Sequence, residues 1–142
     1  MHIFVPIGFL ITLPLQNAEK SLIRAMDCKE NLLGPWDPEV SHILCRLGVL
    51  YIELNQFNDA EACFERALAI REEKLGPYHS RVAQTLKHMI TLYEMIELYD
   101  KAIDYGLRAM NVTIKNFGEN HDHGMIQSSL VFPSQAHFSP NY

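Results

Sequence analysis

Residues 47–67 read LGVLYIELNQFNDAEACFERA and contain the pattern that decides the fold. Before the polar break at 55–58, apolar and small residues recur at i, i+3, i+4 and i+7, the spacing of one α-helical face: Leu44, Leu47, Gly48 and Tyr51. After the break, a second helical stripe follows: Ala60, Phe64, Ala67 and Leu68. Because the break is short, the two helices are predicted to be antiparallel neighbours.

The same pattern returns at a fixed interval along the chain. An interval of 42 residues separates the glycines at 34, 76 and 118, the alanines at 18, 60 and 102, and the alanines at 25, 67 and 109. The copy of the first helical face is Leu86, Met89, Ile90 and Tyr93. The copy of the second is Ala102, Gly106, Ala109 and Met110. A fixed period of this length predicts a solenoid of stacked helical hairpins.

The expected helix ends carry suitable residues. Asp37 is a good N-cap and Pro38 suits the first helical position, while His79 or Ser80 would cap the equivalent start in the next unit. Glycine accepts the left-handed conformation in which many helices stop. It stands at each expected end of a second helix: Gly34, Gly76 and Gly118.

Small residues are expected where helix backbones approach each other. Gly48, Ala60 and Ala67 lack bulk at such positions, and Tyr51 and Phe64 would supply the large apolar contacts. In the third unit Gly106 replaces the residue equivalent to Phe64, so that contact is expected to be weaker.

The chain is therefore predicted to be all-α, with about five helices in a repeat domain at 15–121. The domain divides into a half repeat at 15–34 and full repeats at 35–76 and 77–118. A solenoid normally needs about three repeats to be stable, so this short stack is expected to be marginal.

The two ends of the chain do not follow the repeat. Residues 1–14 form an apolar segment that could cover the exposed face of the first helix. Residues 122–142 are predicted to be a disordered tail, because Pro133 and Pro140 break helices and the apolar pattern does not return.

The motif Leu47-Gly48-x-x-Tyr51, followed by Ala60-x-x-x-Phe64-x-x-Ala67, resembles the signature of tetratricopeptide repeats. The long period and the segment ALAIREEKLG at 67–76 resemble the extended repeats of kinesin light chains and nephrocystin-3. This resemblance implies a non-catalytic protein-interaction module or scaffold. It also implies a cytoplasmic location, with a link to cilia or the cytoskeleton.

Composition argues against several other classes of function. A net charge of −5 and a pI near 5.7 leave no broad basic surface for nucleic acid. The apolar start at 1–15 is too short for a membrane-spanning helix and has no preceding Lys or Arg, so neither membrane insertion nor a signal peptide is expected. Three cysteines, an odd count without a CxxC pair, are expected to be reduced thiols.

Catalytic and metal sites are likewise not expected. His121 and His123 are a candidate metal pair, but His121 repeats the position of His79 and is better explained as a turn residue. Cys45 and His42 could lie on one helical face as a nucleophile and its base, but no third orienting group follows. No glycine-rich phosphate loop is present. No enzyme activity, cofactor or metal is therefore predicted.

By resemblance, the first helix of each repeat lines a concave groove that holds an extended peptide. The residues expected there are His42, Cys45, Arg46, Val49, Ile52, Gln84, Lys87, His88, Thr91 and Glu94. Kinesin light chains often carry paired asparagines at positions that here read Cys45-Arg46 and Lys87-His88.

The charges of this groove suggest the kind of partner. Arg46 and Lys87 are expected to be cationic near neutral pH, with His88 partly protonated, whereas Glu53 and Glu94 lie toward the far ends of the same helices. A protein partner with an acidic segment is therefore predicted. The alternatives are a solvated face without a ligand and a truncated structural fragment of a longer repeat protein with little binding of its own. Self-association through the open repeat ends is a further expectation.

Overall fold

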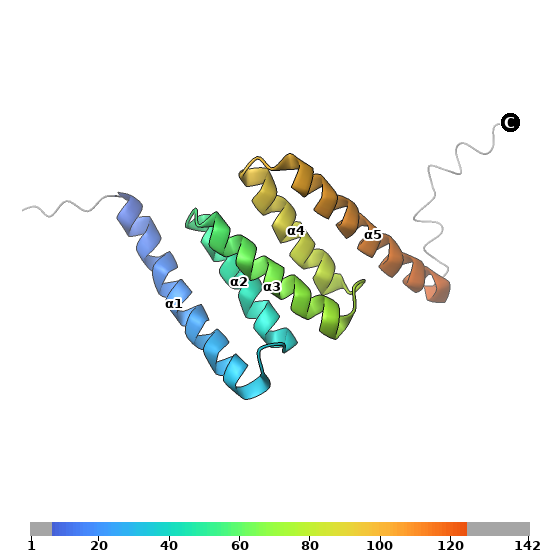
Figure 1. Cartoon of the computed structure of the whole chain (residues 1–142), viewed down its shortest axis with the longest axis horizontal. Helices are drawn as coiled ribbons and strands as arrows, with labels where there is room; N and C mark the ends of the chain where they lie inside the picture. Colours follow the sequence, from blue (N-terminus) through green and yellow to red (C-terminus); the bar gives the residue numbers. More distant parts are fainter. Residues whose placement is uncertain (1–6, 125–142) are drawn as a thin grey trace, which may run out of the picture.

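The computed structural model describes the backbone of residues 7–124 and the side chains of residues 12–118. Helices account for all the regular structure in this range, which confirms the predicted all-α solenoid of five helices (Figure 1). Their bounds are α1 Ile7–Leu33, α2 Pro38–Glu53, α3 Phe57–Leu75, α4 Ser80–Met95 and α5 Tyr99–Gly124.

The helices stack in one array, with α1 and α5 at opposite ends (Figure 1). Helix α2 packs against α3 and α4 packs against α5, so each pair forms a helical hairpin. Helix α1 packs on α2, and α3 packs on α4, which joins the hairpins into a stack. The number of residues from the start of α2 to the start of α4 equals the number from the start of α3 to the start of α5. The second hairpin therefore repeats the first.

The core of each hairpin pairs one small residue with one large residue. In the first hairpin Phe64 is fully buried, and a Cβ added to Gly48 would lie 2.5 Å from Phe64 Cε1. The predicted close approach at Gly48 is therefore confirmed. In the second hairpin the sizes are exchanged: Ile90 stands in place of Gly48, and a Cβ on Gly106 would lie 4.0 Å from Ile90 Cδ1. Both hairpins keep one large residue at this contact, but from opposite helices.

Two polar contacts between helices also occur twice, at equivalent positions of successive repeats. The Tyr51 hydroxyl donates to Glu19 Oε1 at 3.1 Å, and the Tyr93 hydroxyl donates to Glu61. The second contact is an arginine–glutamate ion pair, present as Arg66 with Glu30 and as Arg108 with Glu72. Tyrosine and arginine thus fix equivalent helices at equivalent points along the stack.

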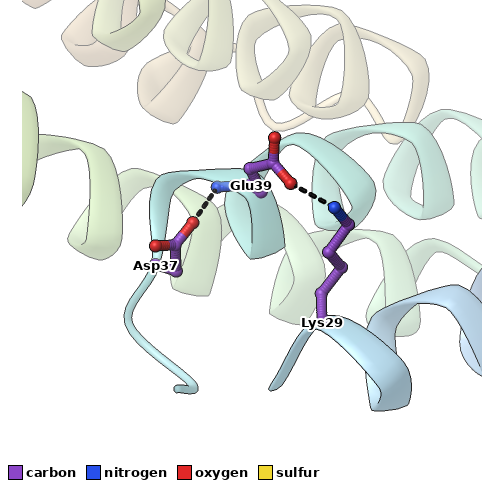
Figure 2. A network of polar contacts seen from close by, with 3 residues as sticks. All are labelled: Lys29, Asp37 and Glu39. Atoms are coloured by element: carbon purple, nitrogen blue, oxygen red, sulfur yellow. Dashed lines mark hydrogen bonds and ion pairs between the residues drawn. The ribbon is translucent and has the colours of Figure 1, made fainter. Parts of the chain in front are cut away.

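The predicted N-caps are present. Asp37 Oδ1 accepts a hydrogen bond from the Glu39 backbone N–H at 2.9 Å, and Lys29 of α1 forms an ion pair with the Glu39 carboxylate (Figure 2). His79 caps α4, because its Nδ1 accepts from the Arg81 backbone N–H at 3.0 Å. A side chain therefore satisfies a free N–H at the start of both α2 and α4.

Removing the first cap should cost measurable stability. The substitution Asp37→Ala is expected to lower the free energy of unfolding by about 1 kcal/mol, a typical value for losing an N-cap. Urea unfolding of the whole chain measures the change. Lys29→Ala serves as the control, because it removes only an exposed ion pair at the same place. Equal losses for the two variants would show that the cap contributes nothing beyond the ion pair.

One predicted helix end is wrong. Gly34 and Gly76 follow the last residues of α1 and α3 with φ of 93° and 97°, as expected of glycine stops. Gly118, however, lies inside α5, which continues to Gly124. The reason is the following residue. Proline comes directly after the first two glycines and cannot continue a helix, whereas Glu119 comes after Gly118.

The apolar start of the chain also differs from expectation. Helix α1 begins at Ile7, inside the segment 1–14 that the repeat pattern excludes. It passes through Pro14, which removes one backbone hydrogen bond without ending the helix. Residues 7–14 therefore extend α1 along its axis, so the expected cover over its exposed face is wrong for them.

The predicted disordered tail at 122–142 falls mostly outside the described part of the chain. Its first three residues belong to α5, so for them the prediction is wrong, and residues 125–142 are not described. Among the five described helices, none has both the length and the apolar character needed to traverse a bilayer.

Candidate functional site

A hollow of about 300 Å³ opens between α2 and α4, with α3 beneath it. It is lined by His42, Cys45, Arg46 and Val49 from α2, Gln84 and His88 from α4, and Arg71 from α3. Six of the ten residues predicted for the groove are therefore brought together here. Of the remaining four, Ile52 packs against the core, and Lys87, Thr91 and Glu94 are exposed on α4.

Arg71 is the residue that sequence reasoning missed. Its side chain is fully buried and connects three helices. The guanidinium donates from Nε to Ser41 Oγ of α2 at 3.1 Å. From Nη1 it donates to the Arg81 carbonyl at 3.0 Å and to Thr85 Oγ1 at 2.8 Å, both of α4. All of these acceptors are uncharged, so hydrogen bonds hold the guanidinium without neutralising it.

No described carboxylate pairs with Arg71: the ion pairs among side chains 12–118 involve other residues. Burial lowers the pKa of Arg71 from its ordinary value, but a guanidinium stays protonated in proteins. The hollow therefore has a buried positive charge in its floor. A signal did exist in the sequence, because Arg71 lies seven residues after Phe64 on the apolar face of α3, where a charged residue is unexpected.

The two histidines of the hollow are less basic than expected. Burial lowers the pKa of His88, and Arg71 lowers it further. Burial also lowers the pKa of His42, with further decreases from Arg71, Arg81 and Arg46. Both shifts reduce the fraction of His88 and His42 that is protonated near neutral pH. The arginines therefore contribute more of the positive charge of the hollow than the histidines do.

The His88 ring also has a packing role. It stacks on the ring of Phe64, with centroids 5.4 Å apart and an interplanar angle of 9°. Phe64 in turn contacts the backbone of α2 at Gly48. The position of this wall of the hollow is thus fixed by the core of the first hairpin.

Cys45 and Cys63 do not have the features of a nucleophile. Cys45 is buried, its Sγ lies 3.8 Å from Thr85 Oγ1, and burial raises the pKa of its thiol. Burial also raises the pKa of Cys63 to about 11. A thiol rather than a thiolate is therefore the dominant form near neutral pH. Cys28 is exposed, and all three cysteines are free.

Metal ligands do not gather within the described side chains, where no group of three His, Cys, Asp or Glu residues could hold an ion. The candidate pair His121 and His123 lies outside the side chains that the structure describes.

A second and larger hollow of about 520 Å³ adjoins the first, and His42 lines both. It lies at the N-terminal ends of α2 and α4, with the C-terminal ends of α1 and α3 beside it. Its charged residues are of mixed sign: Lys29 and Glu39, which pair with each other, and Arg81. Residues of four helices form this hollow, so the spacing of residues along any one helix does not predict it.

The family follows from a direct comparison. A family model described as Tetratricopeptide repeat matches residues 14–73 and 39–115. The chain belongs to the tetratricopeptide repeat family. The two overlapping matches together cover most of the chain and include α2, α3 and α4 completely. Tetratricopeptide repeats generally mediate protein–protein interaction, and the family is non-catalytic.

Solved structures show the same tetratricopeptide fold. The chain is similar to the crystal structure of BtubC (BKLC) from P. vanneervenii, with a TM-score of 0.67 and 21% sequence identity. The match covers 70% of this chain and 39% of that one, so the present chain corresponds to well under half of the BtubC structure. A search of the curated proteins found no match.

Proposed function

We propose that this tetratricopeptide chain is an interaction module that binds an extended segment of a protein partner in the groove along α2 and α4. We further propose that an acidic side chain of the partner lies over the hollow. The observation that supports this most directly is Arg71, a buried cation with no acidic partner among the described side chains. Arg46 adds an exposed positive charge at the edge of the same hollow.

The electrostatic reason is the low polarity around Arg71. A charge surrounded by protein is less screened than a charge in water, so it attracts an anion above it more strongly. Asp and Glu side chains satisfy this attraction, whereas an apolar side chain would leave the buried cation without a counterion. Lys87 extends the positive region along α4, and Glu94 makes the far end negative. A bound peptide would therefore have a preferred direction.

The small contact area of the site sets the expected affinity for a peptide. Two adjoining hollows of about 300 and 520 Å³ can receive side chains of an extended peptide, but two hairpins offer little area. Small interfaces of this kind are usually weak, so dissociation constants on the order of micromolar are expected.

Charge reversal at the edge of the hollow tests the proposal. Arg46→Glu and Lys87→Glu are each expected to weaken binding of acidic ten-residue peptides by roughly fivefold, equivalent to about 1 kcal/mol. The measurement is fluorescence anisotropy with labelled acidic peptides and neutral peptides of matched length. Added salt should weaken the binding of the acidic peptides, because ions screen exposed charges. The binding of the neutral peptides should not change.

Lys74→Glu is the matched control, because it makes the same change of charge at an exposed position near the end of α3. Equal weakening by Lys74→Glu and Arg46→Glu would mean that total charge, not the groove, determines binding. If no acidic peptide binds more tightly than its neutral counterpart, the solvated face or the structural fragment becomes the better description.

A second interaction is supported by the end of the stack. We propose that the chain self-associates through an open repeat end, because the described part of α5 leaves large apolar side chains exposed to solvent. A cytoplasmic site of action, with a link to cilia or the cytoskeleton, rests on the resemblance to kinesin light chains and nephrocystin-3.

A further inference from the structure

Helix α5 carries a second apolar face that no other described helix covers. Its members are each between 55% and 60% exposed and recur with spacings of four, four, three and four residues. We call them the α5 stripe: Tyr99, Ile103, Leu107, Met110 and Ile114. The buried residues Ala102, Ala109 and Val112, which pack on the rest of the stack, lie on a different face. A continuous exposed apolar stripe of this length marks an interaction surface.

From this stripe we infer that two copies of the chain pair through α5 in antiparallel orientation. This inference rests on the proposed self-association and assigns it a surface, an orientation and a symmetry. A two-fold pair requires one patch that is complementary to itself. The stripe meets this requirement, because its spacing is nearly the same when read from either end. With Leu107 beside the two-fold axis, Ile103 faces Met110 of the second copy, and Tyr99 faces Ile114.

The charges along one edge of the stripe favour the antiparallel orientation. Asp100 and Asp104 lie on the N-terminal half of this edge and form no ion pair among the described side chains. Lys115 lies on its C-terminal half, with its ammonium 5.4 Å from the centre of the Tyr78 ring. Antiparallel pairing sets Asp100 of one copy near Lys115 of the other, and the same pair forms again by symmetry.

A parallel two-fold pair would instead place this charged edge of the two copies on opposite sides of the interface, so Asp100 of one copy would not meet Lys115 of the other. It would also align the two helix dipoles, which antiparallel pairing opposes. The other cations of α5 do not alter this pattern, because Lys101 and Arg108 pair with Glu61 and Glu72 of α3. The edge of the stripe therefore presents acid at one end and base at the other.

The described side chains of α1, at the opposite end of the stack, do not form an equivalent surface. Among the side chains that the structure describes, the large exposed apolar residues on and just after α1 are Leu13, Leu32, Leu33 and Trp36. They gather at the two ends of that helix and leave its middle without a stripe. The α5 stripe is thus the better surface for a second copy. Five side chains from each copy bury a small area, so the dissociation constant of the pair is expected to be on the order of ten micromolar.

Sedimentation of the whole chain across a wide range of concentration tests the pairing. The wild-type chain should pass from monomer to dimer, and Leu107→Asp should stay monomeric at the highest concentration. Leu32→Asp is the control, because Leu32 is also exposed but lies on α1. A monomeric wild-type chain would overturn the inference. A dimer that survives Leu107→Asp would overturn it too, while leaving self-association through another surface intact.

A charge swap tests the partner contact. Asp100→Lys alone and Lys115→Asp alone should each weaken dimerisation several-fold, and the double variant should restore most of it. Restoration requires that residue 100 of one copy lies near residue 115 of the other. If the double variant loses as much dimerisation free energy as the two single variants lose together, the assigned orientation is overturned.

Disulfide trapping distinguishes the two orientations directly, in a Cys28→Ser background that removes the exposed cysteine. Leu107→Cys should give a linked dimer on mild oxidation, because the two sulfurs would meet beside the axis. Tyr99→Cys should not, because the two positions would be about 24 Å apart in the antiparallel pair. Efficient linking through Tyr99→Cys would indicate a parallel pair and contradict the inference. Arg46→Glu, which tests the groove, should dimerise normally.

Discussion

The Gly48→Leu chain is expected to unfold with about 3 kcal/mol less free energy than the wild-type chain, at the upper end of the usual cost of overpacking. A Cβ at this position would lie 2.5, 2.6 and 2.9 Å from three carbons of the Phe64 ring. That ring cannot withdraw easily, because it is fully buried and stacks on His88. Replacing glycine within a helix would gain at most about 1 kcal/mol in helix propensity, so the clash decides the sign.

The matched comparison is Ile90→Leu at the equivalent position of the second hairpin. Ile90 already fills that space, and an apolar exchange of similar volume usually costs less than about 1.5 kcal/mol. Thermal melting followed by circular dichroism should place Gly48→Leu about 10 °C below the wild type and Ile90→Leu close to it. Equal melting temperatures for the two variants would show that α2 and α3 separate to admit the larger side chain.

A compensating pair provides a second check. The double variant Gly48→Ile with Phe64→Gly reproduces in the first hairpin the Ile90–Gly106 pair of the second. It should be more stable than Gly48→Ile alone, because removing the ring makes room for the new side chain. If the double variant is the less stable of the two, the lost burial of Phe64 outweighs the relieved clash.

The sequence is sufficient for the parts of the fold that local chemistry decides. The cap at Asp37 and the stops at Gly34 and Gly76 depend on residues within a few positions of each other. The predicted stop at Gly118 is wrong because glycine permits a helix to end but does not force it; the proline that follows the other two glycines does. The predicted start of α1 is wrong because a helix can pass through proline, here Pro14, at the loss of one hydrogen bond.

The candidate site is only half predictable. Its α2 and α4 residues follow from helical spacing and the family resemblance, and six of ten line one hollow. Arg71 lies on α3, the second helix of its repeat, whereas the predicted groove residues lie on the first helices. Its position under the groove depends on how α3 packs against both α2 and α4. The histidine charges depend on the same packing, because burial next to Arg71 lowers the pKa of His88. Neither feature can be obtained from spacing along a single helix.

Two substitutions at Arg71 should separate its structural role from its electrostatic role. Arg71→Ala removes a large, fully buried side chain and its hydrogen bonds to α2 and α4, so the free energy of unfolding should fall by about 3 kcal/mol or more. Arg71→Met restores most of the volume without the charge. Its cost should be smaller, about 1 kcal/mol, because well-packed apolar residues can replace buried charges at little net loss. Urea unfolding measures both values.

Peptide binding by Arg71→Met then tests whether the buried charge attracts an acidic side chain. The Ser41 and Thr85 hydroxyls keep other partners when the guanidinium is lost, because they donate to the carbonyls of Pro38 and Arg81. The fold around the hollow should therefore persist in Arg71→Met. If the buried cation attracts an acidic side chain above it, this variant should bind acidic peptides up to about tenfold more weakly, a change of about 1.4 kcal/mol. Neutral peptides should bind as they do to the wild type. An Arg71→Met chain that binds acidic peptides normally would limit Arg71 to joining α3 with its neighbours, leaving Arg46 and Lys87 as the charges that select an acidic partner.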